Sequence, residues 1–230
     1  MKDGVRKILL WSIVCFVFSA TGVFAAEVHL WKLQKDLEGI QVFTREVENS
    51  PILELRGEIE VDADIERTIR LYEQTERMTE WFHRSKEAKL LKSVSASEKH
   101  IYFAADLPWP LSDRDGIYRR VKAVDSVTQS VVYTLYAEVD TYPKRKDRVR
   151  VNYLDGEWRF TPRPGGRTAI SYRMHTEAGG YIPAGVVNRF TVSLPFRTLL
   201  NFRRLLQKNQ PSISPLESVK IQTVKDGQGL

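Results

Sequence analysis

The sequence predicts an α+β fold in which a curved antiparallel β-sheet wraps around one long C-terminal α-helix. Repeated β-type segments separated by short polar connections run from residue 88 to residue 176, which is typical of an antiparallel meander. After residue 180 the pattern changes to an apolar stripe at helical spacing that continues to Gln207. With 230 residues, of which 42% are hydrophobic and 28% charged, the chain has the size and composition of one folded domain.

The first 25 residues have the three-part pattern of a secretory signal peptide. A basic start is followed by an apolar run from Ile8 to Ala20, and Val23 and Ala25, in the Val-x-Ala pattern of Val23-Phe24-Ala25, predict cleavage after Ala25. The alternative is an uncleaved membrane anchor, because residues 8–26 approach the ~20 apolar residues that span a bilayer. Both interpretations predict export. Cleavage, which we favour, predicts a periplasmic protein, and retention predicts a domain tethered to a membrane.

The composition of the remaining chain argues against several function classes. The only cysteine, Cys15, lies in the apolar run, so the mature chain can form no disulfide. Loss of three basic residues and one acidic residue with the signal lowers the formal net charge from +6 to +4, and no nucleic-acid motif accompanies this charge. The four histidines lack metal-ligand spacing, and no nucleophile elbow, phosphate loop or dinucleotide fingerprint is present. We predict no metal site, cofactor, nucleic-acid partner or catalytic residue.

The domain is expected to begin at residue 26 with a short helix. Apolar residues recur near helical spacing from Glu27 to Leu37, and Gly39 follows as a stop signal. Alternating segments from Gly39 to Val47 and from Leu53 to Val61 then predict a hairpin, with Asn49-Ser50-Pro51 as its turn.

Two short helices are expected before the rest of the sheet. Asp62 or Asp64 can cap the first, from Ile65 to about Tyr72, and the second runs from Glu76 to Phe82. The β-type segments that follow are Lys89–Val94, Lys99–Asp106, Gly116–Val124, Ser130–Val139, Arg148–Leu154, Trp158–Thr161 and Arg167–Thr176.

The longest helix closes the domain. Pro183 can occupy its first turn, the apolar stripe runs to Gln207, and Pro195 is predicted to kink or break it. The domain is expected to end at residue 210, and residues 211–230 to form a loosely ordered tail. A sheet bent around such a helix leaves a cavity unless large side chains fill it, and that cavity favours an apolar ligand. This order of elements is that of the helix-grip fold.

Three sequence stretches carry a family resemblance. They are ADLPWPLSDRDGIYRR (Ala105–Arg120), EWRFTPRPGGRTAISYRM (Glu157–Met174) and EAGGYIPAGVVNRF (Glu177–Phe190). They resemble the link between two central strands, the late hairpin and the entry into the C-terminal helix of START lipid-transfer domains in their exported bacterial form. Glu177-Ala178 departs from the Asp-Pro-like pair common there. The resemblance covers Trp31 to Gln207.

The resemblance implies an internal tunnel for one lipid or other hydrophobic molecule, with the C-terminal helix and neighbouring loops as its lid. The lipid-binding residues that we expect along this tunnel are Trp81, Trp109, Arg114, Tyr133, Leu135, Trp158, Tyr172, Val187, Phe190 and Leu194.

Several of these residues have a second interpretation. The loop with Leu107, Trp109 and Leu111 forms either a membrane-touching lip or ligand gate, or a plug of the core beneath it. Arg114 either makes salt bridges with its two aspartate neighbours that organise the loop, or binds the polar head of a ligand. The tyrosine hydroxyls either orient a ligand or are satisfied within a filled core, and Trp158 has the same alternatives.

The sequence therefore predicts a monomeric, non-enzymatic domain that binds and transfers or senses a hydrophobic ligand, with transient contact to a membrane surface. The alternatives are a cyclase or hydrolase of the same fold acting on an apolar substrate, and an interaction module with a vestigial cavity. Convergence of Arg114, Tyr133 and His175 would favour the enzyme. Complete packing of the helix stripe from Val187 to Leu206 would favour the interaction module.

Overall fold

The computed structural model describes residues 30–138, 142–177, 179–180 and 182–208. Its elements in chain order are β1 (Lys32–Leu37), β2 (Ile40–Val47), β3 (Ser50–Val61), α1 (Ile65–Glu73), the 3₁₀ helix η1 (Thr75–Arg77), α2 (Met78–Trp81), β4 (Ser85–Ser93), β5 (Glu98–Ala105), β6 (Asp113–Val124), β7 (Val131–Glu138), β8 (Arg148–Arg150), β9 (Tyr153–Arg163), β10 (Arg167–Glu177), α3 (Ala184–Asn188) and α4 (Phe190–Lys208). The predicted signal peptide and C-terminal tail lie outside these residues. In the described part of the chain, no helix is long and apolar enough to cross a membrane.

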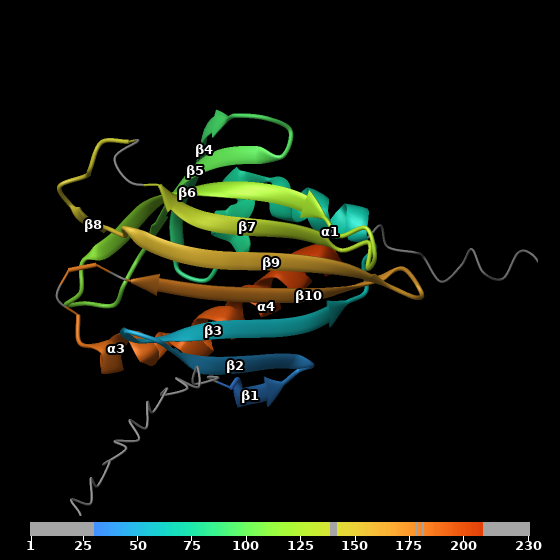
Figure 1. Ribbon diagram of the computed structural model, residues 1–230, viewed down its shortest axis with the longest axis horizontal. Helices are drawn as coiled ribbons and strands as arrows, with labels where there is room; N and C mark the ends of the chain where they lie inside the picture. The colour runs from blue at the N-terminus through green and yellow to red at the C-terminus, as the bar shows by residue number, and fades with distance from the viewer. Residues whose placement is uncertain (1–29, 139–141, 178, 181, 209–230) are drawn as a thin grey trace, which may run out of the picture.

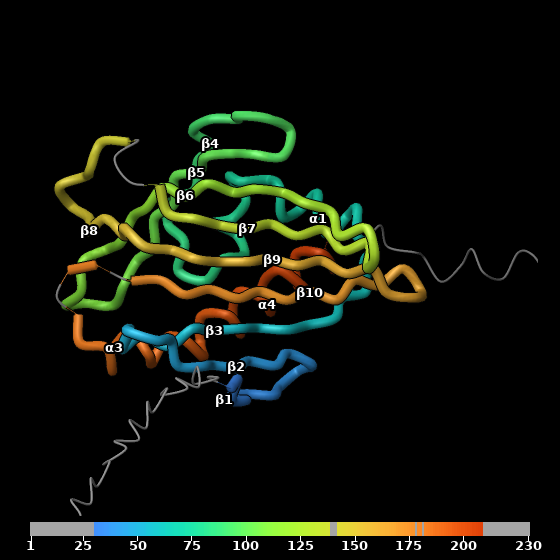
Figure 2. The backbone as a smooth tube through the Cα atoms, viewed as in Figure 1, coloured from blue at the N-terminus to red at the C-terminus, as the bar shows by residue number. Residues whose placement is uncertain are grey.

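The strands form one sheet in the order β1-β2-β3-β10-β9-β7-β6-β5-β4, and neighbours along this path are antiparallel. β8 lies off the path and pairs in parallel with β6. β10 joins the N-terminal hairpin to the later strands because it pairs with both β3 and β9. Figures 1 and 2 show the sheet curving in front of α4, which crosses behind its central strands. The predicted helix-grip fold is confirmed.

The opening segment is a strand, so the helix predicted for residues 27–37 is wrong from Lys32 onward. β1 pairs with β2 through a two-residue turn, in which Glu38 and Gly39 have φ values of 54° and 69°. Positive φ at both turn positions supplies the twist that paired antiparallel strands need. Leu33 and Leu37, which suggested a helical stripe, are both exposed on this edge strand. Residues four apart fit strand spacing as well as helical spacing.

The β2–β3 hairpin and the short helices are confirmed, with small shifts at their ends. The hairpin turn is Glu48-Asn49, with Asn49 at a φ of 61°, so Ser50 and Pro51 already belong to β3. Asp64 caps α1, because its carboxylate accepts a hydrogen bond of 2.8 Å from the backbone N–H of Arg67.

The later strands are confirmed except around residues 148–161. The structure has a short parallel β8 and a long β9 in place of two separate antiparallel segments. The predicted connection at residues 155–157 is part of β9, where Gly156 pairs with Leu135 on β7 and Met174 on β10. A Cβ atom at Gly156 would lie 3.3 Å from the Leu135 side chain, so this glycine marks close packing rather than a turn.

The C-terminal helix is interrupted at Arg189, between α3 and α4, while α4 continues through Pro195, so of the predicted kink or break at Pro195 the break is wrong. Asn188 holds this junction against β3. Its side chain accepts a hydrogen bond of 3.0 Å from the Leu53 N–H and donates one of 3.1 Å to the Pro51 carbonyl.

α4 lies unusually close to the sheet where Pro195 and Leu199 pass over Gly57 of β3. A Cβ atom at Gly57 would lie 2.8 Å from Leu199 Cδ1 and 3.1 Å from Pro195 Cβ, so only glycine permits this approach. Further along, Arg203 donates to the Glu38 carbonyl at 2.7 Å. The C-terminal part of α4 is therefore fixed to the sheet.

The core lies between this part of α4 and the concave face of the sheet. Trp81 packs edge-on against Trp158 and Phe202, with ring centroids 5.6 Å and 5.0 Å apart. Trp158 also stacks on Tyr172 at 4.3 Å. All four side chains are fully buried, so the aromatic core ends directly beside the cavity described below.

Candidate functional site

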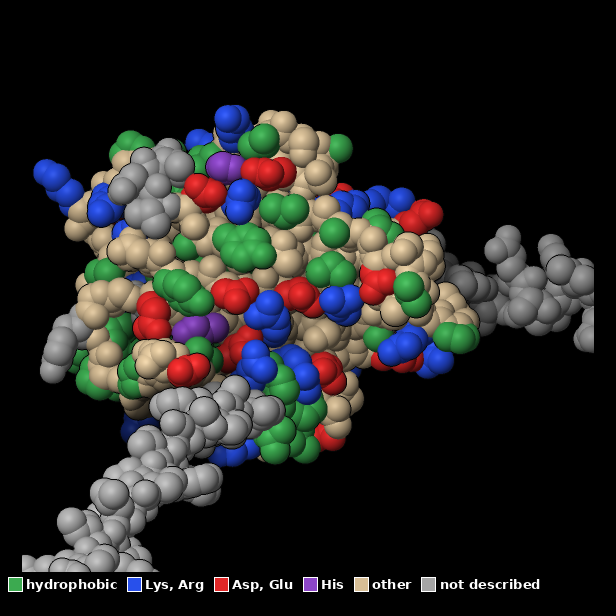
Figure 3. All heavy atoms as spheres, in the orientation of Figure 1, with side chains coloured by type: hydrophobic (Ala, Val, Ile, Leu, Met, Phe, Trp, Pro, Cys, Tyr) green, Lys and Arg blue, Asp and Glu red, His purple; other side chains and the backbone are tan. Residues whose placement is uncertain are grey.

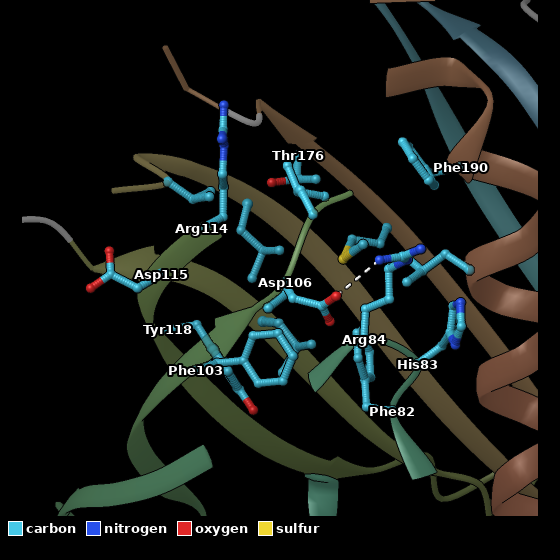
Figure 4. Close-up of a pocket in the computed structure, with 18 of the residues that line it drawn as sticks. Phe82, His83, Arg84, Phe103, Asp106, Arg114, Asp115, Tyr118, Thr176 and Phe190 are labelled. Carbon is cyan, nitrogen blue, oxygen red and sulfur yellow. Dashed lines mark hydrogen bonds and ion pairs between the residues drawn. The ribbon is translucent and has the colours of Figure 1, made fainter. Parts of the chain in front are cut away.

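A cavity of about 220 Å³ lies between the concave face of the sheet and the N-terminal end of the long helix (Figure 4). Its wall comes from β5, β6, β7, β9 and β10, and its cover from α3, the start of α4 and the loop after β5. Most lining side chains are apolar, and they include Phe82, Phe103, Leu107, Leu111, Leu154, Met174, Ile182, Val186 and Val187.

The cavity exists because small residues occupy the concave positions beneath it. Gly116 on β6 and Ala137 on β7 both line it, and a Cβ atom at Gly116 would meet nothing closer than 3.7 Å. Alternation along β6 places Arg114, Gly116 and Tyr118 on the same face. Tyr118 is buried at the floor of the cavity. An apolar ligand thus has space along β6 and β7.

The mouth of the cavity is formed by partly exposed lining residues from the loop after β5 and from α3. Arg84 directly precedes β4 and Asp106 directly follows β5. Their side chains form an ion pair at the mouth, with Arg84 Nη1 3.0 Å from Asp106 Oδ2 (Figure 4). Arg84 has a φ of 65°, and its guanidinium lies 5.7 Å from the ring centroid of Phe190 on α4. Arg84 therefore contacts both the edge of the sheet, through Asp106, and the helix that covers the cavity, through Phe190.

Arg114 lies at the cavity wall and is turned toward the segment after β10. It donates to the Ser112 carbonyl and, at 3.1 Å, to the Gly179 carbonyl. Burial lowers its pKa, and Asp113 opposes that shift. Asp113 instead pairs with Lys86 at 2.6 Å, which holds the Asp113 pKa below its usual value. Both aspartates beside Arg114 have other cations as partners, since Asp115 pairs with Arg150.

The Asp115–Arg150 pair is the most deeply buried ion pair of the described residues. Arg150 Nε and Nη2 donate to the two carboxylate oxygens at 2.9 and 3.1 Å. Tyr102 donates a third hydrogen bond to Asp115 at 3.1 Å. Figure 4 shows Asp115 pointing away from the aromatic residues of the cavity, so this pair organises the wall from its outer side.

Three buried tyrosines, Tyr72, Tyr118 and Tyr172, line the cavity, and the hydroxyls of the last two contact thioether sulfur. Tyr118 donates to Met78 Sδ at 3.2 Å and Tyr172 donates to Met174 Sδ at 3.3 Å. Burial raises the pKa of Tyr118 to about 12, so the phenol is neutral at physiological pH. Thioether sulfur is a weak acceptor, which leaves both hydroxyls able to donate to an oxygen of a bound ligand.

Seven of the ten expected lipid-binding residues line the cavity. They are Arg114, Leu135, Trp158, Tyr172, Val187, Phe190 and Leu194. The other three lie elsewhere. Trp81 is in the aromatic core, Tyr133 donates to Glu73 at 2.7 Å beneath α1, and Trp109 is 92% exposed. Trp109 therefore does not plug the core, whereas its neighbours Leu107 and Leu111 do line the cavity.

Several lining residues were not expected from the sequence. Phe82, His83 and Arg84 reach the mouth from the short link between α2 and β4, which has no periodic signal. Tyr118 was within reach of sequence reasoning, because it follows Arg114 on the same face of β6.

The residues that would favour an enzyme do not converge. Tyr133 lies outside the lining and His175 lies on the outer face of β10, with Nε2 3.4 Å from Glu177 and its ring beside Tyr153. Among the described residues, no group of three or more histidines, cysteines, aspartates or glutamates is arranged to hold a metal ion.

Comparison with known proteins places the chain in a family. The family model described as START domain matches residues 24–212. The uncharacterized protein PA1579 of Pseudomonas aeruginosa is 34% identical over 192 residues, which make up 84% of this chain and 93% of that protein. A fragment of the STAR-related lipid transfer protein from Xanthomonas axonopodis has a crystal structure with a TM-score of 0.72 and 32% identity, covering 77% of this chain and 98% of that one.

The same architecture extends to distant proteins. Human StAR-related lipid transfer protein 5 has a TM-score of 0.71 at 18% identity, covering 77% of this chain and 86% of that one, and thus shares the fold. The match of the family model across most of the chain, with two relatives above 30% identity, settles the assignment. The chain belongs to the START domain family.

Proposed function

We propose that this domain binds a lipid or other hydrophobic molecule in its cavity and transfers or senses it without transforming it. The observation that carries the proposal is an apolar cavity bounded by the sheet, α3 and the start of α4 in a START domain. The related Xanthomonas protein is described as a lipid transfer protein, which supports the same reading. Burial of apolar ligand surface gains about 25 cal/mol per Å² before ordering costs, so desolvation supplies the affinity.

The distribution of side chains supports this proposal over its rivals. Arg114, Tyr133 and His175 lie apart, so the polar cluster that a cyclase or hydrolase would need is missing among them. The helix stripe is only partly packed. Leu199 and Phe202 are fully buried, while Val187 faces the cavity, which argues against a vestigial cavity.

The first experiment is native mass spectrometry with lipid extraction on protein purified from its own compartment. We expect a bound hydrophobic molecule of defined mass. An empty protein, in preparations that keep detergents out, would contradict the proposal.

Filling the cavity should displace the ligand. Ala137→Phe places a ring into the empty space over β7, so we expect occupancy to fall at least tenfold while the midpoint of thermal unfolding is retained or rises. Val132→Phe is the matched control, because Val132 lies on the outer face of the same strand. Equal occupancy in both variants would show that the ligand does not lie in this cavity.

We propose that Trp109 contacts the membrane during exchange. Its indole is 92% exposed beside the mouth, and indoles favour the membrane interface. Trp109→Ser is expected to slow lipid extraction from vesicles severalfold and leave the thermal midpoint unchanged, because the side chain is not packed. Tyr136→Ser, at an exposed aromatic of the outer sheet face, should change neither. A fall in stability without slower extraction would assign Trp109 a structural role instead.

We also propose that the protein is exported and acts in the periplasm. The support is the signal-like pattern of residues 1–25, which lies outside the described residues. N-terminal sequencing of the purified protein tests it. A chain that begins near residue 26 supports a free carrier, and a chain that retains residues 8–26 supports a tethered domain.

A further inference from the structure

The segment between β7 and β9 is rich in basic residues. In its described part, residues 142–150, five side chains are basic and one is acidic. Pro143 to Asp147 form its exposed tip, which contains the consecutive cations Lys144, Arg145 and Lys146. We call residues 143–148 the basic loop.

The base of this loop is fixed by buried arginines. Arg150 donates to the Tyr142 and Pro143 carbonyls at 3.2 and 3.1 Å while it pairs with Asp115. Arg148 donates to Glu87 and to the Tyr102 hydroxyl, each at 2.9 Å. Two cations thus hold the base, and the exposed tip is presented from a defined position.

The base of the loop adjoins the mouth of the cavity. β8 pairs with β6 over Asp113 to Asp115, directly after the loop that carries Trp109. Val149 lies against the segment after β10, since a Cβ atom at Gly180 would be 3.5 Å from it, and Val151 lines the cavity. Figure 1 shows β8, α3 and the loop between β5 and β6 at the same end of the molecule.

The charge at this tip is only partly balanced by neighbouring carboxylates. Arg145 Nη1 lies 3.6 Å from Glu87 Oε2, and Arg145 Nε lies 3.5 Å from Asp147 Oδ1. Glu87 also pairs with Arg148. Lys144 and Lys146 flank that arginine and are exposed. The parallel pairing of β8 with β6 places these lysines at the same end of the molecule as the Trp109 loop (Figure 1), and Figure 3 shows Lys and Arg side chains projecting at this edge. Lysine ammonium groups and an exposed indole at one end suit an anionic bilayer surface, where cations contact head groups and the indole lies at the interface.

We infer that the basic loop docks the cavity mouth onto an anionic lipid bilayer, with Lys144 and Lys146 contacting the head groups while Trp109 enters the interface. This rests on the proposed function, because it gives the membrane contact a charge preference and an orientation. An exposed indole beside an apolar cavity favours a bilayer over a protein or a nucleic acid as the partner.

The test measures binding of the purified protein to vesicles by sedimentation. One set contains phosphatidylcholine alone, and the other contains equal parts of phosphatidylcholine and phosphatidylglycerol. Lys144→Glu/Lys146→Glu is expected to weaken binding to the anionic set by about tenfold or more at low salt, since each lysine near such a surface contributes appreciably. High salt should remove the difference between parent and variant.

A control with the same charge change separates location from net charge. Lys92→Glu/Lys208→Glu reverses two exposed lysines, one near the end of β4 and one at the last residue of α4, and should leave binding within about twofold of the parent. Equal weakening in both double variants, or none in the basic-loop variant, would overturn the inference. Binding only to another protein or to nucleic acid would do the same.

The docking surface and the proposed function can be contradicted separately. Bound lipid in the purified parent and in both double variants is measured separately by mass spectrometry. If lipid is bound but docking does not depend on charge, only the inferred docking surface is contradicted. If docking depends on charge but the protein never carries a lipid, only the proposed function is contradicted.

Discussion

Replacement of Asp115 by alanine is expected to lower the free energy of unfolding by about 3–5 kcal/mol. The change leaves the buried Arg150 guanidinium without the carboxylate that accepts two of its hydrogen bonds, and it also removes the acceptor of the Tyr102 hydroxyl. An uncompensated buried charge is far less stable than the pair. Urea unfolding followed by circular dichroism measures the loss, with the slope of the transition compared between variants.

Two further variants identify the cause. Asp113 lies two residues before Asp115 on β6 and pairs with the exposed Lys86 of β4, and Lys86→Ala is expected to change stability by less than about 1 kcal/mol. Asp115→Ala combined with Arg150→Met removes the buried guanidinium that would otherwise lack its carboxylate, and it should recover part of the lost free energy of unfolding. A loss below about 1 kcal/mol for Asp115→Ala alone would mean that water or a shifted side chain takes over the role of the carboxylate.

Replacement of Gly57 by valine is expected to destabilise the domain by about 2–3 kcal/mol. The new Cβ atom would lie 2.8 Å from Leu199 and 3.1 Å from Pro195, and both belong to the helix that closes the core. Leu199 is fully buried and cannot move aside freely, so α4 must shift. The midpoint of thermal unfolding should fall by several degrees.

Gly116→Val is the matched control, because Gly116 is also a strand glycine that lines the concave side. A Cβ atom there would make an ordinary van der Waals contact with Val151, whose Cβ lies 3.7 Å away, and would meet no atom at a clashing distance. Valine has the better strand propensity, so stability should be retained or rise, while ligand occupancy falls. If both valine variants lost the same stability, the cause would be a general intolerance of side chains on this face and not the approach of α4.

The sheet and the long helix were predictable because their patterns are local and repeated. Alternation of apolar and polar residues identified β2 and β3, and β-type composition identified β5, β6, β7 and β10. Asp64 is one of the two residues expected to cap α1. Val187, Phe190 and Leu194 line the cavity, and their stripe is visible in the sequence. Periodicity therefore located one wall of the site and its cover.

The remaining features depend on packing between distant segments. β1 has the spacing of a helix, and only its pairing with β2 through Glu38-Gly39 makes it a strand. Tyr133 shares a strand face with Leu135, but its hydroxyl donates a hydrogen bond to Glu73 and the residue does not line the cavity. The Arg84–Asp106 pair joins the residue before β4 to the residue after β5, and no sequence pattern indicates this ion pair. Such partners are set by the tertiary fold.

The break at Arg189 divides the cover of the cavity into two parts with different attachments. α3 has five residues, none of them fully buried, and Asn188 ties its end to β3. α4 is held along the sheet at Gly57 and Glu38. A tilt of α3 alone would open the mouth over Val186 and Val187 without disturbing the aromatic core. We expect ligand escape to require only the movement of α3, whereas global unfolding must also release α4 from the sheet, so the residence time of a ligand and the lifetime of the folded state should depend on different residues.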